Sequence, residues 1–277
     1  MHHFRSFLLT GLLLFLLVSS RAVGAAAPRI VSLNGTISEI ICALGRQPQL
    51  VGVDVTSTYP EALAKLPKVG HNRNISAEGV LALSPTLVVG TTESLKPEVA
   101  AQLKAAGVPV QLFRQDYSAA GTRQLIQDVA ATFGASAQVP AVTARLDAEL
   151  AKVQKPAAAP RVLFIYARGA GTLMVAGQGT SVEKIMQMAG ARNAAVGFTD
   201  FKPLTAEALV AANPDVLLLF DSGLASLGGK TGLLQIPGVA QTTAGRTGRV
   251  VEMDGQLLTG FGPRLGQATA ELARKLR

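Results

Sequence analysis

One imidazole in this chain is placed where it could do chemistry. Of the three histidines, His2 and His3 lie at the very start of the chain, which leaves His71 in the short run VGHNR at residues 69–73. Arg73 disfavours the imidazolium form of His71, because two nearby cations repel each other. A neutral ring nitrogen is the form that coordinates a metal. A plain surface or core role for His71 is the alternative.

Few other side chains have chemistry to offer. Tyr59 lies in the polar run TSTYP, and Tyr166 ends an apolar run two residues before Arg168. The plain role of Tyr59 is a structural or lining residue, and that of Tyr166 is a strand-end residue with a solvated hydroxyl. The single cysteine, Cys42, lies in the apolar run IICAL and is predicted to pack as a small hydrophobe.

The spacing of these residues argues against an enzyme. No Ser-His-Asp arrangement is suggested, and Cys42 and His71 are not an evident pair. A bare zinc or manganese site needs three or four His, Asp or Glu ligands, so one histidine is too few. The glycine-rich loops at 168–171 and 177–180 lack the signatures of a nucleotide site. We expect a binding protein, with acid–base catalysis by a lone histidine as the remaining enzyme alternative.

Residues 1–27 have the three parts of a secretory signal peptide. Arg5 supplies the positive charge, residues 7–18 form an apolar run of 12, and two small-residue cleavage patterns follow at 23–27. An uncleaved membrane anchor is the alternative, although the run is short for a bilayer span. No cysteine lies near the cleavage patterns, so a lipid anchor is not indicated. We expect a cleaved signal and a periplasmic location.

The composition suits one large domain or two lobes. The part after the signal has about 250 residues, enough to bury a full core without disulfides. The chain carries 26 basic and 18 acidic residues, and removing Arg5 and Arg21 leaves 24 − 18 = +6. With no Lys/Arg cluster and few aromatic residues, nucleic-acid binding is weakly supported. A basic cleft for an anionic small molecule fits equally well.

The chain alternates between short apolar strands and short helices, apart from one stretch. Residues 28–117 read as an α/β lobe with a parallel sheet, and residues 159–277 as a second such lobe. Between them, residues 118–158 show helical spacing on both sides of Gly134 and predict a helical connector. The pattern therefore predicts the α/β fold class, with two α/β units joined by a helical connector.

An internal repeat supports two similar lobes. The run ISAEGVLALSPTLVV at 75–89 matches LTAEALVAANPDVLL at 204–218 in its hydroxyl cap, glutamate, proline turn and strand. Glu78 and Glu207 therefore occupy equivalent helix starts, where a carboxylate stabilises a helix by about 0.3–1 kcal/mol. The same two carboxylates are also candidates for contact with a partner that carries basic residues.

The chain resembles the periplasmic solute-binding proteins of ABC importers for haem, in the class that also serves cobalamin and ferric siderophores. The resemblance covers essentially the whole chain after the signal. It is carried by the repeated Ala-Glu helix and by the motifs RIVSLN at 29–34, TSTYP at 56–60, LPKVG at 66–70, GQGT at 177–180 and GFGPR at 260–264. It implies two similar parallel-sheet lobes joined by a long connecting helix, with a ligand cleft between the lobes and only modest motion of one lobe against the other. It also implies haem as the transported ligand, with no catalytic cofactor.

The resemblance also implies site residues. In the haem branch the loop after Val-Gly usually reads Tyr-x-Arg, with the tyrosine bound to ferric iron. Here His71 takes the tyrosine position as the expected axial ligand, with Tyr59 and Tyr166 as fallbacks. Arg73 and Arg168 are expected to contact a haem propionate or orient the ligand. The residues expected to line the cleft are Tyr59, Phe198, Phe201, Leu258 and Phe261.

The class further implies a partner. Glu78 and Glu207 match the glutamates that dock onto arginines of the permease, so the expected partner is an inner-membrane ABC permease dimer with its ATPase. The binding protein itself is expected to be a monomer. The same scaffold with cobalamin or a ferric siderophore as ligand is the alternative, because imidazole also ligates cobalt.

Overall fold

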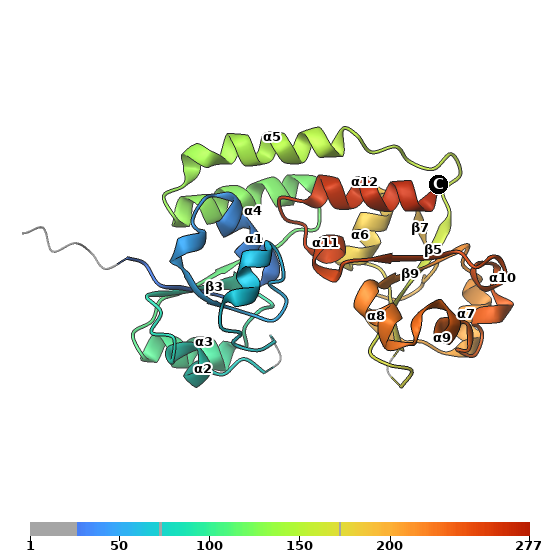
Figure 1. Cartoon of the computed structure of the whole chain (residues 1–277), viewed down its shortest axis with the longest axis horizontal. Coiled ribbons are helices and arrows are strands. Elements are labelled where there is room, and N and C mark those ends of the chain that lie inside the picture. Colours follow the sequence, from blue (N-terminus) through green and yellow to red (C-terminus); the bar gives the residue numbers. More distant parts are fainter. Residues whose placement is uncertain (1–26, 72–73, 172) are drawn as a thin grey trace, which may run out of the picture.

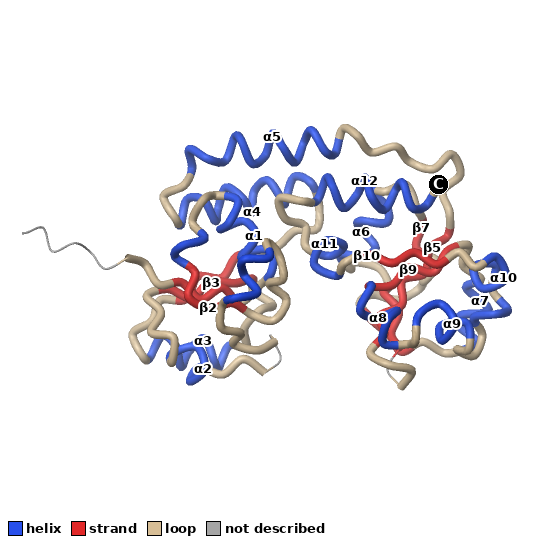
Figure 2. The backbone as a smooth tube through the Cα atoms, in the orientation of Figure 1, coloured by secondary structure: helices blue, strands red, loops and turns tan. Residues whose placement is uncertain are grey.

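We describe a computed structural model of the chain for residues 27–71, 74–171 and 173–277. The predicted signal peptide at 1–27 lies outside these residues except for Ala27, and Arg73 lies outside them too. The chain forms two α/β lobes side by side, bridged along one side by helices (Figures 1 and 2). Among the described residues, no helix is both long enough and apolar enough to span a bilayer.

The first lobe is built on a parallel four-stranded sheet with the order β2-β1-β3-β4. Alternate residues of its strands pack on opposite faces, which is why the strands read as continuous apolar runs. Ile30 and Val89 enter one hydrophobic core, whereas Val31 and Val88 enter another. The elements are β1 Ile30–Ser32, α1 Gly35–Ala43, η1 Gln47–Gln49, β2 Leu50–Val53, η2 Glu61–Lys65, α2 Ala77–Leu81, β3 Leu87–Thr91, α3 Pro97–Ala105 and β4 Val110–Phe113.

The second lobe has a six-stranded sheet with the order β10-β9-β5-β6-β8, and β7 also pairs with β5. Its strands are β5 Arg161–Ala167, β6 Leu173–Ala176, β7 Arg192–Asn193, β8 Phe201–Pro203, β9 Val216–Phe220 and β10 Val250–Met253. Its helices are α6 Ser181–Met188, α7 Ala206–Ala212, α8 Asp221–Ser226, α9 Gly229–Leu234, η4 Val239–Gln241, α10 Thr243–Thr247, α11 Gly255–Thr259 and α12 Leu265–Leu276.

This second sheet is mixed rather than wholly parallel, which corrects the sequence-based expectation. β6 runs antiparallel to β5, and β8 runs antiparallel to β6. Only residues 168–172 separate β5 from β6, and so short a connection allows a hairpin but no crossover helix. The remaining pairs, β5 with β7, β5 with β9 and β9 with β10, are parallel as predicted.

The connector consists of α4 Ala119–Thr132, η3 Ser136–Gln138 and α5 Val139–Leu150. Gly134, with φ of 57°, separates the two longer helices, as the sequence predicts. α4 packs in the first lobe. Of the connector helices, α5 is the one that runs toward the second lobe, and the C-terminal helix α12 lies beside it (Figure 1). The bridge is therefore a pair of helices. The exact lobe limits at 117 and 159 stay a prediction.

One hydrophobic core continues through both lobes. It takes in Ile37 and Ile41 of α1 together with Phe164 of β5 and Leu218 of β9, joined through α4, α5 and α12. Burial of apolar surface is the main stabilising term in folding, so separating the lobes would expose part of this core to water. The packing favours lobes that are rigidly connected at the bridge.

Candidate functional site

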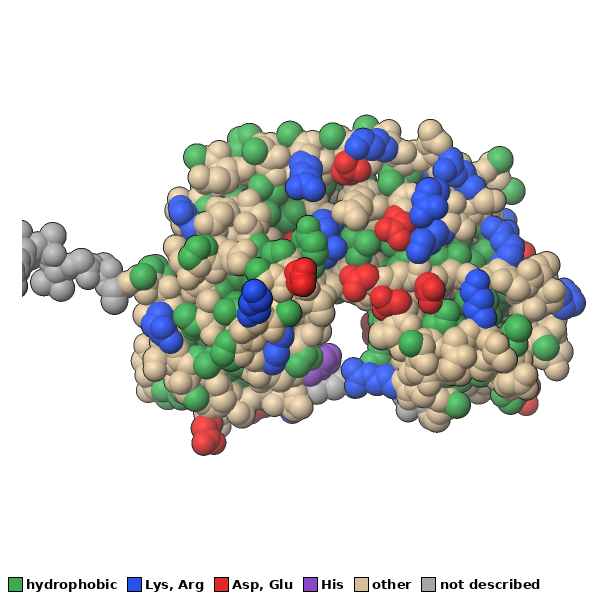
Figure 3. Space-filling model, viewed as in Figure 1, with side chains coloured by type: hydrophobic (Ala, Val, Ile, Leu, Met, Phe, Trp, Pro, Cys, Tyr) green, Lys and Arg blue, Asp and Glu red, His purple; other side chains and the backbone are tan. Residues whose placement is uncertain are grey.

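Two adjoining cavities lie between the lobes on the side away from the helical bridge. Their volumes are about 730 and 780 Å³, and both are lined by Val55, His71, Tyr166, Arg168 and Phe220. The purple histidine in Figure 3 lies at the rim of the opening between the lobes. The structure thus brings together His71, Tyr166 and Arg168, which the sequence singled out separately.

The backbone around His71 is held by local hydrogen bonds. Val69 N donates to Val53 O over 3.0 Å, and Val55 N donates to Gly70 O over 3.0 Å, which ties the loop to the end of β2. His71 N donates to Asn74 Oδ1 over 2.8 Å. Gly70 has φ of 105°, where a side chain would be strained. These contacts fix the loop so that His71 faces the cavity.

The opposite wall comes from the second lobe. Tyr166, near the end of β5, packs edge-to-face on Phe220 with ring centroids 6.0 Å apart, and Phe220 packs likewise on Phe164 at 4.9 Å. The Arg168 guanidinium carbon lies 5.6 Å from the centroid of the Tyr166 ring. Phe201 lines the larger cavity and is 44% exposed, in agreement with its expected place in the cleft. This wall offers a phenol, an aromatic surface and one cation.

Positive and negative side chains lie in different parts of the cleft. Arg168 lines both cavities, whereas Asp221 and Asp254 line only the smaller of the two. In Figure 3 acidic side chains gather above the opening, toward the helical bridge. An anionic group on a ligand is therefore favoured near Arg168 and disfavoured near the two aspartates. Among the described residues, no group of three or more His, Cys, Asp or Glu side chains is arranged to hold a metal ion.

Four of the residues expected to line the cleft lie elsewhere. Leu258 and Phe261 are 0% and 1% exposed and belong to the main hydrophobic core, so their predicted place in the cleft is wrong. The Phe261 ring packs on Tyr117 at 5.3 Å instead. Phe198 lines a separate pocket of the second lobe. Tyr59 lines a cavity at the lobe junction rather than the two described above.

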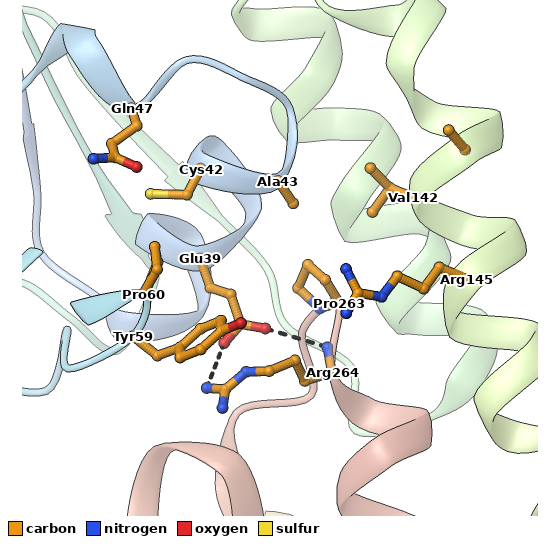
Figure 4. A pocket seen from close by; sticks show the side chains of 11 residues that line it. Glu39, Cys42, Ala43, Gln47, Tyr59, Pro60, Val142, Arg145, Pro263 and Arg264 are labelled. Atoms are coloured by element: carbon orange, nitrogen blue, oxygen red, sulfur yellow. Dashed lines mark hydrogen bonds and ion pairs between the residues drawn. The ribbon is translucent and has the colours of Figure 1, made fainter. Parts of the chain in front are cut away.

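That junction cavity has a volume of about 390 Å³ (Figure 4). Arg264 donates from Nη2 to Glu39 Oε2 over 2.8 Å and from its backbone N to Glu39 Oε1 over 3.2 Å. The Tyr59 ring covers the guanidinium, with 3.6 Å between Arg264 Cζ and the ring centroid. Tyr59 is thus occupied by a structural contact, which disfavours it as a ligand to a molecule in the cleft.

Sequence reasoning missed several residues that line the two cavities, among them Val55, Asn74, Met174 and Phe220. Met174 lines the larger cavity and is the direct cross-strand partner of Tyr166. Phe220 ends β9 next to Tyr166. Phe220 could have been predicted from its place at the end of an apolar strand, because the carboxyl ends of parallel strands gather at one edge of a sheet, where ligands bind. Met174 depends on the antiparallel register of β6, which the sequence did not indicate.

The two repeated glutamates occupy equivalent places. Ser76 Oγ accepts from Gly79 N at the start of α2, and Thr205 Oγ1 accepts from Ala208 N at the start of α7, each over 3.1 Å. Glu78 and Glu207 lie in the first turns of these helices and are exposed. Both helices lie on the side of their lobes away from α5 (Figure 1). One carboxylate per lobe is therefore presented to solvent.

Solved structures similar to this chain include haem-binding proteins. RhuT from Roseiflexus sp. RS-1, in its apo form, is 44% identical with a TM-score of 0.86, over 90% of this chain and 97% of that one. BhuT in complex with two haems is 42% identical with a TM-score of 0.84, over 90% and 97%. Haem-binding protein HmuT is 34% identical with a TM-score of 0.83, over 90% and 84%. Three further structures of HmuT each have one residue replaced by alanine: a histidine, a tyrosine and an arginine. The tyrosine and the arginine are two residues apart in that chain.

Of two curated relatives, one has no named ligand and the other is named for cobalamin. An uncharacterized ABC transporter substrate-binding lipoprotein, YvrC of Bacillus subtilis, is 29% identical over 90% of this chain and 79% of its own length. A cobalamin-binding protein of Halobacterium salinarum is 26% identical over 88% of this chain and 68% of its own length. The family model described as periplasmic binding protein matches residues 30–257. The chain belongs to this family of binding proteins, as a periplasmic substrate-binding protein of an ABC transporter.

Proposed function

We propose that this protein captures haem in the cleft between its lobes and delivers it to an inner-membrane ABC importer. The observation that carries the proposal is that His71 and Tyr166 line the same cavities from opposite lobes, with Arg168 beside the tyrosine. Imidazole and phenolate are both axial ligands of haem iron in proteins. The solved relatives that bind haem support the same choice of ligand.

In this proposal each wall has a distinct role. His71 binds the iron from the first lobe, and Tyr166 approaches it from the second. Arg168 pairs with a propionate, since arginine binds carboxylates well. Arg73 has the same role in the proposal, although it lies outside the described residues. The apolar faces of Phe201, Phe220 and Val55 suit a flat macrocycle.

The substituted forms of HmuT support this assignment of residues. The tyrosine and arginine replaced there are two residues apart, as Tyr166 and Arg168 are here, and a histidine was replaced as well. Cobalamin is the second candidate, because a curated relative is named for it and imidazole also ligates cobalt. A ferric siderophore is the third. The phenol of Tyr166 facing the cavity favours ferric iron over cobalt.

Delivery requires a docking surface, which we assign to Glu78 and Glu207. Each exposed carboxylate would pair with arginines of one subunit of a permease dimer that works with an ATPase. We further propose that the protein acts as a monomer without catalysis, and that residues 1–27 are a signal peptide removed on export to the periplasm.

The test is a haemin titration of the protein without its signal, followed by absorption spectroscopy. The wild type should give a saturable shift of the Soret band, and His71→Ala and Tyr166→Phe should each change its position and weaken binding. Tyr59→Phe is the matched control, because that tyrosine lies at the junction cavity, and it should bind like the wild type. A parallel titration with cyanocobalamin should show no binding. Saturable cobalamin binding without a haemin response would refute the proposal.

A further inference from the structure

Met174 lines the larger cavity from strand β6. Its strand β6 pairs with β5 in a register that puts Met174 directly opposite Tyr166. Directly opposed residues have side chains on the same face of a sheet, with Cβ atoms about 4.5–5.5 Å apart. Met174 also lines the cavity of about 780 Å³ together with His71. Its thioether is therefore a neighbour of the Tyr166 side chain on the wall that faces the histidine.

The other described methionines have a different environment. Met186 and Met253 are 0% and 2% exposed in the main core, and Met188 packs against that core. The three hydrophobic clusters of the described residues do not include Met174, although its neighbour Leu173 packs against one of them. Core packing thus accounts for the other three described methionines, whereas Met174 lines the cavity.

The chemistry of sulfur and oxygen ligands differs with the charge of iron. A phenolate is a hard anionic ligand that suits Fe³⁺, whereas a thioether is a soft neutral ligand of the kind that pairs with histidine on haem in electron-transfer proteins. Two donors of these two kinds, side by side and opposite one imidazole, offer haem iron a different partner in each oxidation state.

We propose that Met174 is a second axial ligand site in the cleft, which binds ferrous haem in place of Tyr166. The inference rests on the proposed haem function. The ferric complex takes one electron from a one-electron reductant, and the bond between iron and the Tyr166 oxygen breaks. The freed phenolate takes a proton from solvent, and a lone pair of the Met174 sulfur forms the new bond to Fe²⁺. His71 stays bound throughout. The cleft can then hold haem in either oxidation state.

The test compares ferric and dithionite-reduced haem complexes of the wild type, Met174→Leu and Met188→Leu. Leucine nearly conserves the volume of methionine, and Met188 lies away from the cleft, so Met188→Leu is the matched control. The reduced wild type and Met188→Leu should give a six-coordinate low-spin spectrum. Reduced Met174→Leu should be five-coordinate and high-spin, whereas its ferric spectrum should match the wild type. The midpoint potential should fall in Met174→Leu, because a thioether ligand raises it.

A second measurement needs no variant. In the diamagnetic reduced complex, the ε-methyl protons of an iron-bound methionine lie over the porphyrin and are shifted strongly upfield. Proton NMR of methyl-labelled wild type should show one such methionine. No shifted methyl, together with equal reduced spectra of wild type and Met174→Leu, would overturn the assignment of Met174 while leaving haem binding intact. Absence of any saturable Soret shift in the wild type would instead refute the haem function and this inference with it.

Discussion

Glu39 of α1 and Arg264, just before α12, form an ion pair across the lobe junction, with 2.8 Å between Oε2 and Nη2. Their side chains are only 7% and 15% exposed. Gln256 forms further hydrogen bonds across the same junction: its Oε1 accepts from Thr58 N, and its Nε2 donates to Gly35 O. The segment that links the second sheet to the last helix is therefore fastened to the first lobe.

Removal of one partner of this pair should destabilise the fold. Glu39→Ala leaves the guanidinium of Arg264 with the Tyr59 ring but without its counter-charge, and loss of one member of a buried pair costs about 3 kcal/mol or more. Glu39→Gln should cost less, since it keeps the hydrogen-bonding shape. The free energy of unfolding in urea measures both. Asp147→Ala is the control, since the exposed pair of Asp147 with Arg123 should contribute no more than about 1 kcal/mol. Equal losses in the two alanine variants would contradict the role of Glu39.

Ligand binding should change the overall shape of the molecule only slightly. The continuous core, the paired helices α5 and α12, and the contacts of Arg264 and Gln256 all resist a hinge between the lobes. Small-angle X-ray scattering with and without haemin should give nearly the same radius of gyration. The double variant Glu39→Ala/Gln256→Ala should show a larger change on binding. A large closure in the wild type would contradict a stiff junction.

The Cys42 thiol should react slowly in the folded protein. Burial, and secondarily the nearby Glu39 carboxylate, raise the pKa of Cys42 to about 12, and the thiolate is the reactive form. Iodoacetamide at pH 8 should therefore modify folded protein far more slowly than protein in urea, and the native rate should climb as the pH approaches 12. Because the folded pKa lies above the unfolded value, the thiol stabilises the fold fully below about pH 8.5. That contribution is lost as the pH rises toward 12. Rapid native alkylation at pH 8 would contradict this.

Local signals predicted much of the fold and part of the site. The hydroxyl caps Ser76 and Thr205 and the glutamates after them lie where the repeat predicts, because a cap depends on a few neighbouring residues. The backbone just before His71 is held by hydrogen bonds of Val69 and Gly70 with Val53 and Val55, at and just beyond the end of β2.

Contacts between residues distant along the chain determine the placement of several side chains that local sequence patterns do not predict. Leu258 and Gln256 both belong to the five-residue helix α11, yet Leu258 enters the core while Gln256 contacts the first lobe. Phe261 turns inward on a backbone with φ of 49°, and its carbonyl accepts from Thr122 in α4. Met174 reaches the cleft through the antiparallel register with Tyr166. None of these choices leaves a pattern in the local sequence, because each depends on a partner distant along the chain.

Loss of the two repeated carboxylates should separate haem binding from haem delivery. Glu78 and Glu207 are exposed and are not among the residues that line the two cavities, so Glu78→Ala/Glu207→Ala should bind haemin like the wild type. Its stability should fall by no more than about 0.3–1 kcal/mol per helix start. Transfer of haem to the permease reconstituted in vesicles should be abolished in the double variant and reduced in each single one, because each lobe contributes one contact. Glu98→Ala is the matched control, since Glu98 is likewise exposed in the first turn of a helix, α3, and lies outside the repeat. Undiminished transfer by the double variant would show that the protein docks through another surface.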